Sequence, residues 1–257
     1  MSAVTLFHAA PSYYSMIARL TLALGDITYE SRQMDIHRGM DQLSPGYGLI
    51  NPHLTVPALK TDSLTLADSR DILAWAVRER PGIFGNGGVK DQAILDAHYA
   101  ISIEGLTFGR TMLRFPPLRL FFPRLLAKVC RDLRARQAAY PALAGVYEKK
   151  IQQNEARIRF FKEGSLVEKV EDLRQQAHRF IRMIPVPAGI YLWGDHPSQS
   201  DVVLAVFIAR LMMIGEVKVL AERPDLVLWF DRMKKTPAYQ ASDIWTRFSL
   251  RRILFRR

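Results

Sequence analysis

The hydrophobic positions of the first eighty residues follow two different spacings. Val4–Phe7 and Ile27–Asp35 are rich in β-forming residues, and Ser15–Leu24 between them has apolar residues at the three-and-four spacing of a helix. Leu54–Lys60 and Leu64–Ala67 are two more β-forming runs, joined by a short polar turn. The pattern predicts a small sheet flanked by helices.

The predicted helix after these strands has a clear start signal. Asp68 stands at the N-cap position and Asp71 at the third helical position, before an apolar pattern that continues to Ala76. Turn-forming residues over His37–Gly48 predict a loop. The densest cluster of Gly and Pro lies at Arg80–Gly88, and it predicts a domain boundary.

Beyond this boundary the β-forming runs disappear. Helical spacing is found in Asp91–Phe108, Leu125–Lys149, Leu166–Arg182, Asp201–Ile214 and Leu226–Lys234. We therefore predict a first domain at 1–80, a linker at 81–89 and an all-helical domain at 90–257. The helical domain contains an insert at about 110–165 and a basic tail at 245–257.

Composition restricts the class of protein. The chain has 257 residues of which 49% are hydrophobic, which excludes an intrinsically disordered chain. Cys130 is the single cysteine, so an intrachain disulfide and a multi-cysteine metal site are excluded and a reducing compartment is favoured. The apolar run Val202–Ile214 is interrupted by Arg210 and is too short to span a bilayer. With no signal peptide at the start, we expect a cytoplasmic protein.

Charge is distributed unevenly. Residues 1–88 hold 7 Lys/Arg and 8 Asp/Glu, whereas residues 89–257 hold 29 and 17. Arg110–Arg136 has eight basic residues against one acid, interleaved with aromatic residues, and the tail Trp245–Arg257 has five arginines. Two interpretations of these segments remain open: they form a peripheral contact with an anionic membrane, or they are an ordinary surface in contact with water. Nothing beyond charge supports nucleic acid as a partner.

Two segments carry candidate chemistry for binding a peptide-like ligand. Pro57 within a β-forming run belongs at a sheet edge or at a cis turn, where the backbone of Val56 could pair with a bound peptide. At the predicted helix start, free N–H groups and Ser69 could bind a carboxylate while Asp68 binds an ammonium group. Together they suit the zwitterionic end of an amino acid.

The segment Ser12-Tyr13-Tyr14-Ser15 lies between the first predicted strand and helix. A hydroxyl at a helix N-terminus favours an anion such as a thiolate, although Ser12 or Ser15 could equally be only an N-cap. The chain contains no G-x-S-x-G sequence and no pair of histidines with metal-ligand spacing. We therefore predict neither a serine hydrolase nor a metal site.

Five motifs taken together resemble one family. They are Ser12–Arg19, Asn51–Leu59, Asp68–Ile72, Trp193–Asp201 and Arg223–Tyr239. This combination resembles the cytosolic glutathione transferase superfamily, and the long insert resembles its branch of tetrachlorohydroquinone dehalogenases and ganglioside-induced differentiation-associated proteins. The resemblance implies a thioredoxin-like domain followed by an all-helical glutathione transferase C-terminal domain.

The resemblance also implies glutathione as co-substrate and a role for each matching residue. Ser12, or alternatively Tyr14, would stabilise the thiolate. The residues implied to bind glutathione are Gln42, His53, Val56, Pro57, Asp68 and Ser69. Those implied to form the electrophile pocket are Phe7, Tyr99, Ile103, Phe108 and Arg110.

The expected function is that of a detoxifying transferase in which the glutathione thiolate attacks a hydrophobic, aromatic electrophile. Arg110 or Arg114 would attract an anionic group of that electrophile. Leu54 and Thr55 stand where many relatives have a basic residue for the glycine carboxylate, and Tyr14 stands where the dehalogenase has its cysteine. We therefore do not expect full reductive dehalogenation. A homodimer is implied, and the alternative function is a non-catalytic ligand-binding or membrane-surface protein of the same fold.

Overall fold

A computed structural model describes residues 3–85 and 87–248, and its N-terminal part contains a four-stranded sheet. The strands are β1 (Thr5–His8), β2 (Glu30–Gln33), β3 (Ala58–Lys60) and β4 (Thr65–Leu66). They lie in the order β2-β1-β3-β4, with β2 parallel to β1 and both β3 and β4 antiparallel to their neighbours. The predicted strands are confirmed. β1 has the length of its predicted run and is shifted by one residue, whereas the other three strands are shorter than theirs.

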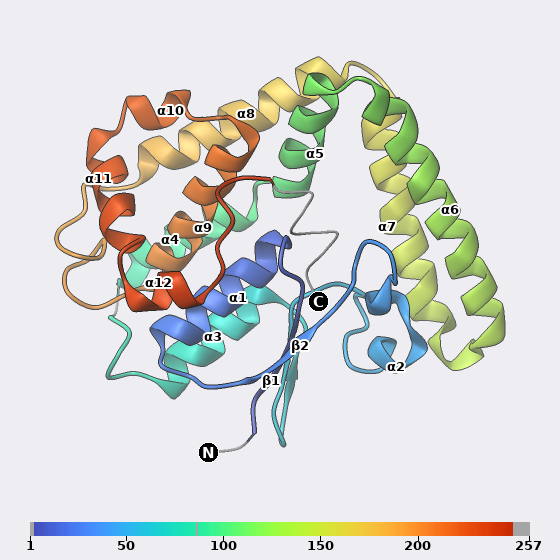
Figure 1. Ribbon diagram of the computed structural model, residues 1–257, viewed down its shortest axis with the longest axis horizontal. Helices are drawn as coiled ribbons and strands as arrows, with labels where there is room; N and C mark the ends of the chain where they lie inside the picture. Colours follow the sequence, from blue (N-terminus) through green and yellow to red (C-terminus); the bar gives the residue numbers. More distant parts are fainter. Residues whose placement is uncertain (1–2, 86, 249–257) are drawn as a thin grey trace.

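Two capped helices pack against each other beside this sheet (Figure 1). α1 (Tyr13–Leu24) begins after Ser12, whose side chain accepts a hydrogen bond from the Ser15 N–H. α3 (Ser69–Glu79) begins after Asp68, as predicted from the N-cap pattern. The segment predicted as a loop contains two short turns of helix, η1 (Asp41–Leu43) and α2 (Pro45–Gly48). This arrangement is the thioredoxin-like domain expected from the sequence.

The rest of the described chain is helical. Its helices are α4 (Gly88–Tyr99), α5 (Ile103–Arg114), α6 (Pro117–Ala139), η2 (Pro141–Leu143), α7 (Ala144–Lys162), α8 (Leu166–Met183), α9 (Gln199–Ile214), α10 (Lys218–Ala221), α11 (Pro224–Met233) and α12 (Pro237–Ala241). The predicted fold class, a thioredoxin-like domain followed by a helical domain, is confirmed.

Two predicted helices are each divided in the structure. The segment predicted as one helix over Asp91–Phe108 breaks before α5, where Ser102 accepts a hydrogen bond from the Gly105 N–H and so caps a new helix. The segment predicted over Leu125–Lys149 breaks at Pro141, which has no N–H to continue the α6 ladder. The three-and-four spacing of apolar residues continues across both breaks, so the sequence pattern does not reveal them.

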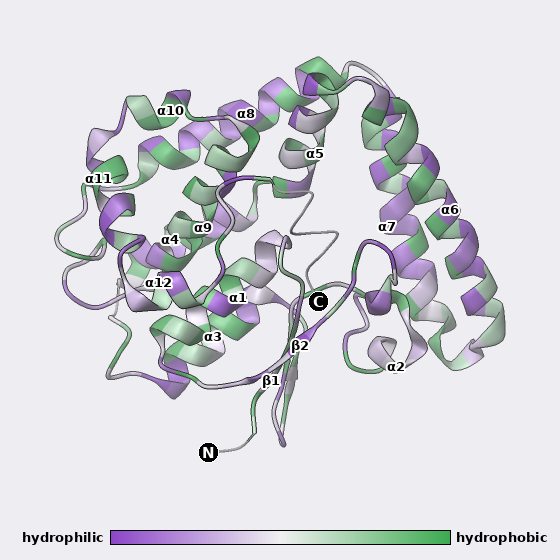
Figure 2. Cartoon of the chain, in the orientation of Figure 1, coloured by the Kyte–Doolittle hydropathy of each residue, from purple (hydrophilic) through white to green (hydrophobic). Residues whose placement is uncertain are grey.

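One apolar core joins the two parts of the chain. Helix α9 lies at its centre, with every residue from Ser200 to Leu211 buried, and it packs against α1, α4 and α5. Figure 2 accordingly colours this helix largely as hydrophobic. At its start Ser198 and Asp201 form a capping box, and buried Asp201 also accepts a hydrogen bond from the Leu192 N–H at 2.7 Å. The motif Trp193–Asp201 therefore fixes the start of the central helix.

Helices α6 and α7 form a long hairpin that extends from the other helices of the helical part and contacts α5 and α8 near one end (Figure 1). Its inner face has a small core of its own, to which Leu133 and Tyr147 contribute. Leu43 and Leu54 of the thioredoxin-like domain belong to the same cluster. The hairpin is therefore held against the segment that precedes Pro57.

Candidate functional site

Ser12 lies at the meeting point of two segments that are distant in sequence. Its hydroxyl caps α1 and lies 3.5 Å from the carbonyl oxygen of Val56, to which it donates. The N-terminus of a helix carries a partial positive charge, because its first N–H groups have no partner within the helix. A hydroxyl at this position can therefore donate a hydrogen bond to an anion placed beside α1.

The Val56–Pro57 peptide bond is cis, in agreement with one of the two expectations from the sequence. The preceding loop is fixed by Tyr47 and Asn51, whose side chains donate to the Thr55 carbonyl at 2.7 Å and 2.8 Å. Within residues 3–85 and 87–248, the Val56 N–H donates to no group. Val56 thus offers a free backbone donor next to Ser12.

The start of α3 carries Asp68 and Ser69, the residues predicted to bind the amino-acid end of the ligand. Asp68 accepts a hydrogen bond from the Arg70 N–H at 2.7 Å. The buried Ser69 hydroxyl lies 3.1 Å from the Tyr99 hydroxyl, so a residue of α4 in the helical domain contacts it directly. The ring of Tyr99 in turn stacks on that of Tyr14, with the ring centres 6.3 Å apart.

Tyr14 is placed to act as a hydrogen-bond donor. Burial, with a smaller contribution from the negative charge of Glu104, raises the pKa of its hydroxyl to about 12, so the proton is retained at neutral pH. This hydroxyl forms no hydrogen bond within the part of the chain that the structure describes. Ser12 and Tyr14 therefore both remain candidates for contact with a thiolate.

The predicted binding residues Gln42 and His53 lie on the side of Pro57 that faces the hairpin. The Gln42 side chain is half-buried and its Oε1 atom has no partner among the described residues. The His53 side chain is exposed, and its carbonyl accepts a hydrogen bond from the buried Lys150 of α7 at 3.4 Å. Lys150 was not predicted from the sequence.

The five residues predicted to line an electrophile pocket have different neighbours in the structure. Tyr99 contacts Ser69, as described above. Phe7 packs near Tyr47 with ring centres 5.7 Å apart, and Phe108 stacks on Phe122 at 4.7 Å. Ile103 is buried in the apolar core that contains α9.

Arg110 forms an ion pair with Glu216, and the negative charge of Glu216 neutralises the Arg110 guanidinium. The roles of these residues stay predictions.

Sequence reasoning missed the basic side chains that lie near Tyr14. Arg157 of α7 forms an ion pair with Glu104, and Arg210 of α9 is buried. Both of these positive charges act to lower the Tyr14 pKa, against the larger effect of burial. For Arg210 a signal existed, namely one charge within an otherwise apolar helical run.

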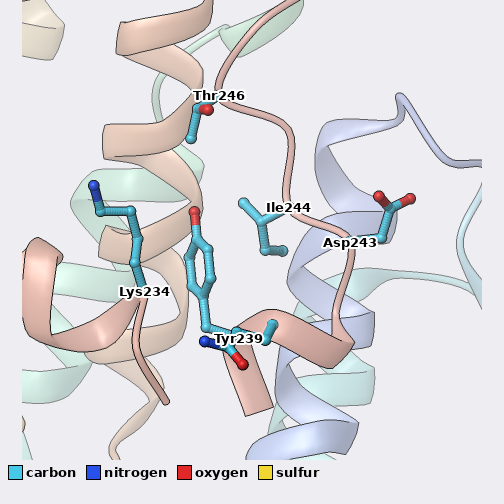
Figure 3. Close-up of a pocket in the computed structure, with 6 residues that line it drawn as sticks. Lys234, Tyr239, Asp243, Ile244 and Thr246 are labelled. Carbon is cyan, nitrogen blue, oxygen red and sulfur yellow. The ribbon is translucent and has the colours of Figure 1, made fainter. Parts of the chain in front are cut away.

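Figure 3 shows an open hollow of about 340 Å³ elsewhere on the protein. It is lined by side chains from the end of α11, from α12 and from the segment after it, among them Lys234, Tyr239 and Thr246. None of its lining residues belongs to the predicted site. The described chain also contains no cluster of His, Cys, Asp or Glu arranged to bind a metal ion.

No helix in the described ranges has the length and hydropathy needed to cross a membrane. The predicted basic tail lies largely outside the described residues, which end at Phe248. Trp245, at its start, is buried in the main core.

Comparison with known proteins shows that this chain is similar to glutathione transferases. Residues 11–79 match the glutathione S-transferase N-terminal domain family. The chain is 23% identical to a tetrachloro-p-hydroquinone reductive dehalogenase of Sphingobium chlorophenolicum, over 95% of this chain and 97% of that protein.

Solved structures of similar fold cover nearly the whole chain. A glutathione transferase family member from Pseudomonas fluorescens with two glutathione bound has a TM-score of 0.63 at 12% identity, over 95% of this chain and 93% of the other. A glutathione transferase homologue from Drosophila mojavensis with bound glutathione has a TM-score of 0.61 at 20% identity, over 94% and 92%. At these identities the likeness establishes the fold.

Proposed function

Because this chain belongs to the cytosolic glutathione transferase superfamily, we propose that it is a transferase that activates the glutathione thiol for attack on a hydrophobic, aromatic electrophile. The observation that carries this proposal is the position of Ser12, with its hydroxyl at the N-terminus of α1 and 3.5 Å from the Val56 carbonyl. A peptide paired with Val56 would place its side chain beside this hydroxyl.

Glutathione would bind across the three elements of the site. Its cysteinyl carbonyl accepts from the free Val56 N–H, beside Pro57. Its γ-glutamyl end lies at the start of α3, where Asp68 binds the ammonium group and the N–H of Ser69 faces the carboxylate. Its glycine carboxylate lies near Gln42 and His53.

Lys150 provides positive charge at the glycine end. Leu54 and Thr55 supply none, whereas the Lys150 ammonium is 3.4 Å from the His53 carbonyl and uses one of its three donors there. The remaining donors can bind a carboxylate. The hairpin therefore supplies a charge that the thioredoxin-like domain lacks at this end.

Ser12 would lower the pKa of the bound thiol. A free thiol has a pKa of about 8.5, so only a few per cent of it is ionised at pH 7. When the Ser12 hydroxyl turns from Val56 to the sulfur, its hydrogen bond and the α1 dipole favour the thiolate. A decrease of ~2 units, equivalent to ~2.7 kcal/mol, ionises most of the thiol at neutral pH. The thiol proton leaves to solvent.

The chemical step is then a displacement or an addition. The thiolate sulfur forms a bond to an electrophilic carbon. In a displacement, the halide or ether oxygen leaves with the electron pair of its bond to that carbon. In an addition, the π electron pair of the attacked carbon moves to the neighbouring atom, which takes a proton from solvent. Tyr14 is the alternative stabiliser of the thiolate, because its hydroxyl keeps its proton and has no partner in the described chain. Cys130, the single cysteine, is buried between α6 and α7, so we propose no step through a protein disulfide.

The ultraviolet absorbance of the bound thiolate, followed against pH in a stopped-flow instrument, tests this mechanism. Ser12→Ala is expected to raise the apparent thiol pKa by about 1–2 units, and Tyr14→Phe reports the alternative donor. Ser63→Ala, in an exposed turn, is the matched control. If neither Ser12→Ala nor Tyr14→Phe moves the pKa, the proposed activation is wrong.

A second candidate function, contact with an anionic membrane surface, is favoured by the start of α6. All residues of Arg114–Phe121 are exposed, including Phe115, Leu120 and Phe121. Exposed apolar side chains between arginines can enter the interface of an anionic bilayer. The homodimer and the cytoplasmic location stay predictions.

Co-sedimentation with vesicles tests the membrane contact. The intact protein is expected to bind vesicles that contain phosphatidylserine, less so at high salt, and not to bind neutral ones. Leu120→Ser with Phe121→Ser should weaken the binding, whereas Val227→Ser with Leu228→Ser, on the exposed face of α11, should not. If the α6 double variant and the α11 double variant bind the vesicles equally well, the exposed residues of α6 do not contact the membrane.

A further inference from the structure

Arg210 is a buried cation without an acidic partner. It lies in the C-terminal half of α9 with 6% of its surface exposed. Its guanidinium donates to the Pro11 carbonyl at 3.2 Å and to the Thr107 hydroxyl at 3.4 Å, and it lies 5.2 Å from the ring centre of Tyr13. Its Nε atom is buried and has no hydrogen-bond partner in the described structure.

The surroundings of Arg210 leave its charge uncompensated. No carboxylate of residues 3–85 and 87–248 forms an ion pair with it. Glu104 is near enough to affect the pKa of Arg210, but it is already paired with Arg157. Burial lowers the Arg210 pKa to about 10, which leaves the side chain charged at neutral pH. A buried charge that lacks a counter-ion is costly, so an anion at this place would be bound favourably.

Arg210 lies next to the segment that carries Ser12. Pro11, whose carbonyl it contacts, directly precedes Ser12. The positive charge of Arg210 also acts on the hydroxyl of Tyr14, which is a free donor within the described chain. A ligand bound beside Ser12 would therefore lie close to this guanidinium and to the Tyr14 hydroxyl.

We propose that Arg210, together with the Tyr14 hydroxyl, binds a negatively charged group of the electrophile, either a carboxylate or an ionised phenol oxygen. This proposal rests on the proposed function, and it adds that the preferred electrophile is an aromatic anion. The guanidinium suits such a group because its Nε hydrogen and a second hydrogen on an Nη atom can bind one carboxylate or phenolate side-on. Arg110, one of the two arginines expected from the sequence, forms an ion pair with Glu216.

Two matched ligands test the proposal without the need for turnover. S-benzylglutathione reports the glutathione site and an apolar pocket, and S-(4-carboxybenzyl)glutathione adds one carboxylate. We expect calorimetry to show that the carboxylate raises affinity for the wild-type protein by about tenfold or more, the usual effect of a charged hydrogen bond. In Arg210→Met the ratio of the two affinities should fall to about one, and Tyr14→Phe should lower it in part.

Arg182→Met is the matched control, since Arg182 is an exposed arginine paired with Glu222 on the surface. It should retain the wild-type ratio. Thermal unfolding of unliganded Arg210→Met should occur at the wild-type temperature or above it, because the change removes a buried unpaired charge. A large decrease would indicate that Arg210 is a structural residue. In that case Arg210→Lys, which keeps the charge, must preserve the preference for the carboxylate.

The possible results separate the two proposals. Equal affinity of the wild-type protein for the two ligands overturns the anion site and leaves the proposed function standing. A tenfold preference that survives in Arg210→Met shows that another residue binds the carboxylate, and it also overturns the assignment. If neither ligand binds, the proposed function is wrong and the assignment of Arg210 is wrong with it.

Discussion

The ammonium of Lys150 lies 3.4 Å from the carbonyl oxygen of His53, and this contact joins the hairpin of α6 and α7 to the loop before Pro57. Lys150 has 6% of its surface exposed, and it forms no ion pair with a described carboxylate. A buried lysine of this kind affects both stability and binding, and the two effects have opposite signs.

Lys150→Met should stabilise the protein at pH 7. Burial lowers the Lys150 pKa to about 8 from 10.5, so between these values the unfolded chain binds more protons and the free energy of unfolding rises with pH. Charged Lys150 therefore destabilises the fold by about 3 kcal/mol at pH 7. Urea unfolding should show the variant to be more stable at pH 7, and this gain should shrink by about 2 kcal/mol at pH 9.5.

The neighbouring exposed residue provides the control for this measurement. Lys149→Met removes the same charge from the surface of α7, and it should change stability by less than about 0.5 kcal/mol at either pH. A gain for Lys150→Met that does not depend on pH would mean that better packing, and not the charge, is responsible.

The same substitution should weaken glutathione binding. If Lys150 binds the glycine carboxylate, Lys150→Met loses a charge-assisted hydrogen bond, and Kd should rise about tenfold. Glutathione whose glycine carboxylate is esterified should bind the wild-type protein and the variant equally. Fluorescence titration of both ligands measures this, and a tenfold loss that persists with the ester would contradict the assignment.

Asp201→Ala should destabilise the whole protein. The Asp201 carboxylate is fully buried and accepts from the Ser198 N–H at 2.8 Å, the Ser198 hydroxyl at 2.6 Å and the Leu192 N–H at 2.7 Å. Alanine leaves these donors without a partner, at a cost of about 3 kcal/mol in the free energy of unfolding. Urea unfolding measures it. Asp195→Ala, at an exposed position of the same loop, should be nearly neutral.

Two glycines should respond to alanine in opposite directions. A Cβ at Gly109 of α5 would clash with the Val170 side chain of α8, so Gly109→Ala should destabilise by about 1–3 kcal/mol. A Cβ at Gly145, in the first turn of α7, would meet nothing within 4 Å. Gly145→Ala should therefore stabilise by about 0.5–1 kcal/mol through helix propensity. Urea midpoints of the two variants test this, and equal effects would contradict the close packing of α5 on α8.

Local chemistry made part of the candidate site predictable. Ser12 and Asp68 are N-cap residues whose side chains bond to N–H groups two or three positions away, so their places followed from neighbouring residues. Pro57 followed from the chemistry of proline within a β-forming run. The divisions of the helical segments were missed, because the apolar spacing that was used to find helices continues across Ser102 and Pro141.

By itself the sequence determined the order of the strands and of the main helical segments, the capped start of α3 and the family motifs, because these depend on residues close together in the chain. Only the tertiary structure decided which charges meet. Lys150 lies beside His53 because the hairpin packs on Leu54, and Arg210 lies beside Pro11 because α9 packs on α1. Such contacts join residues far apart in sequence, and burial in the folded core is what gives their charges a role.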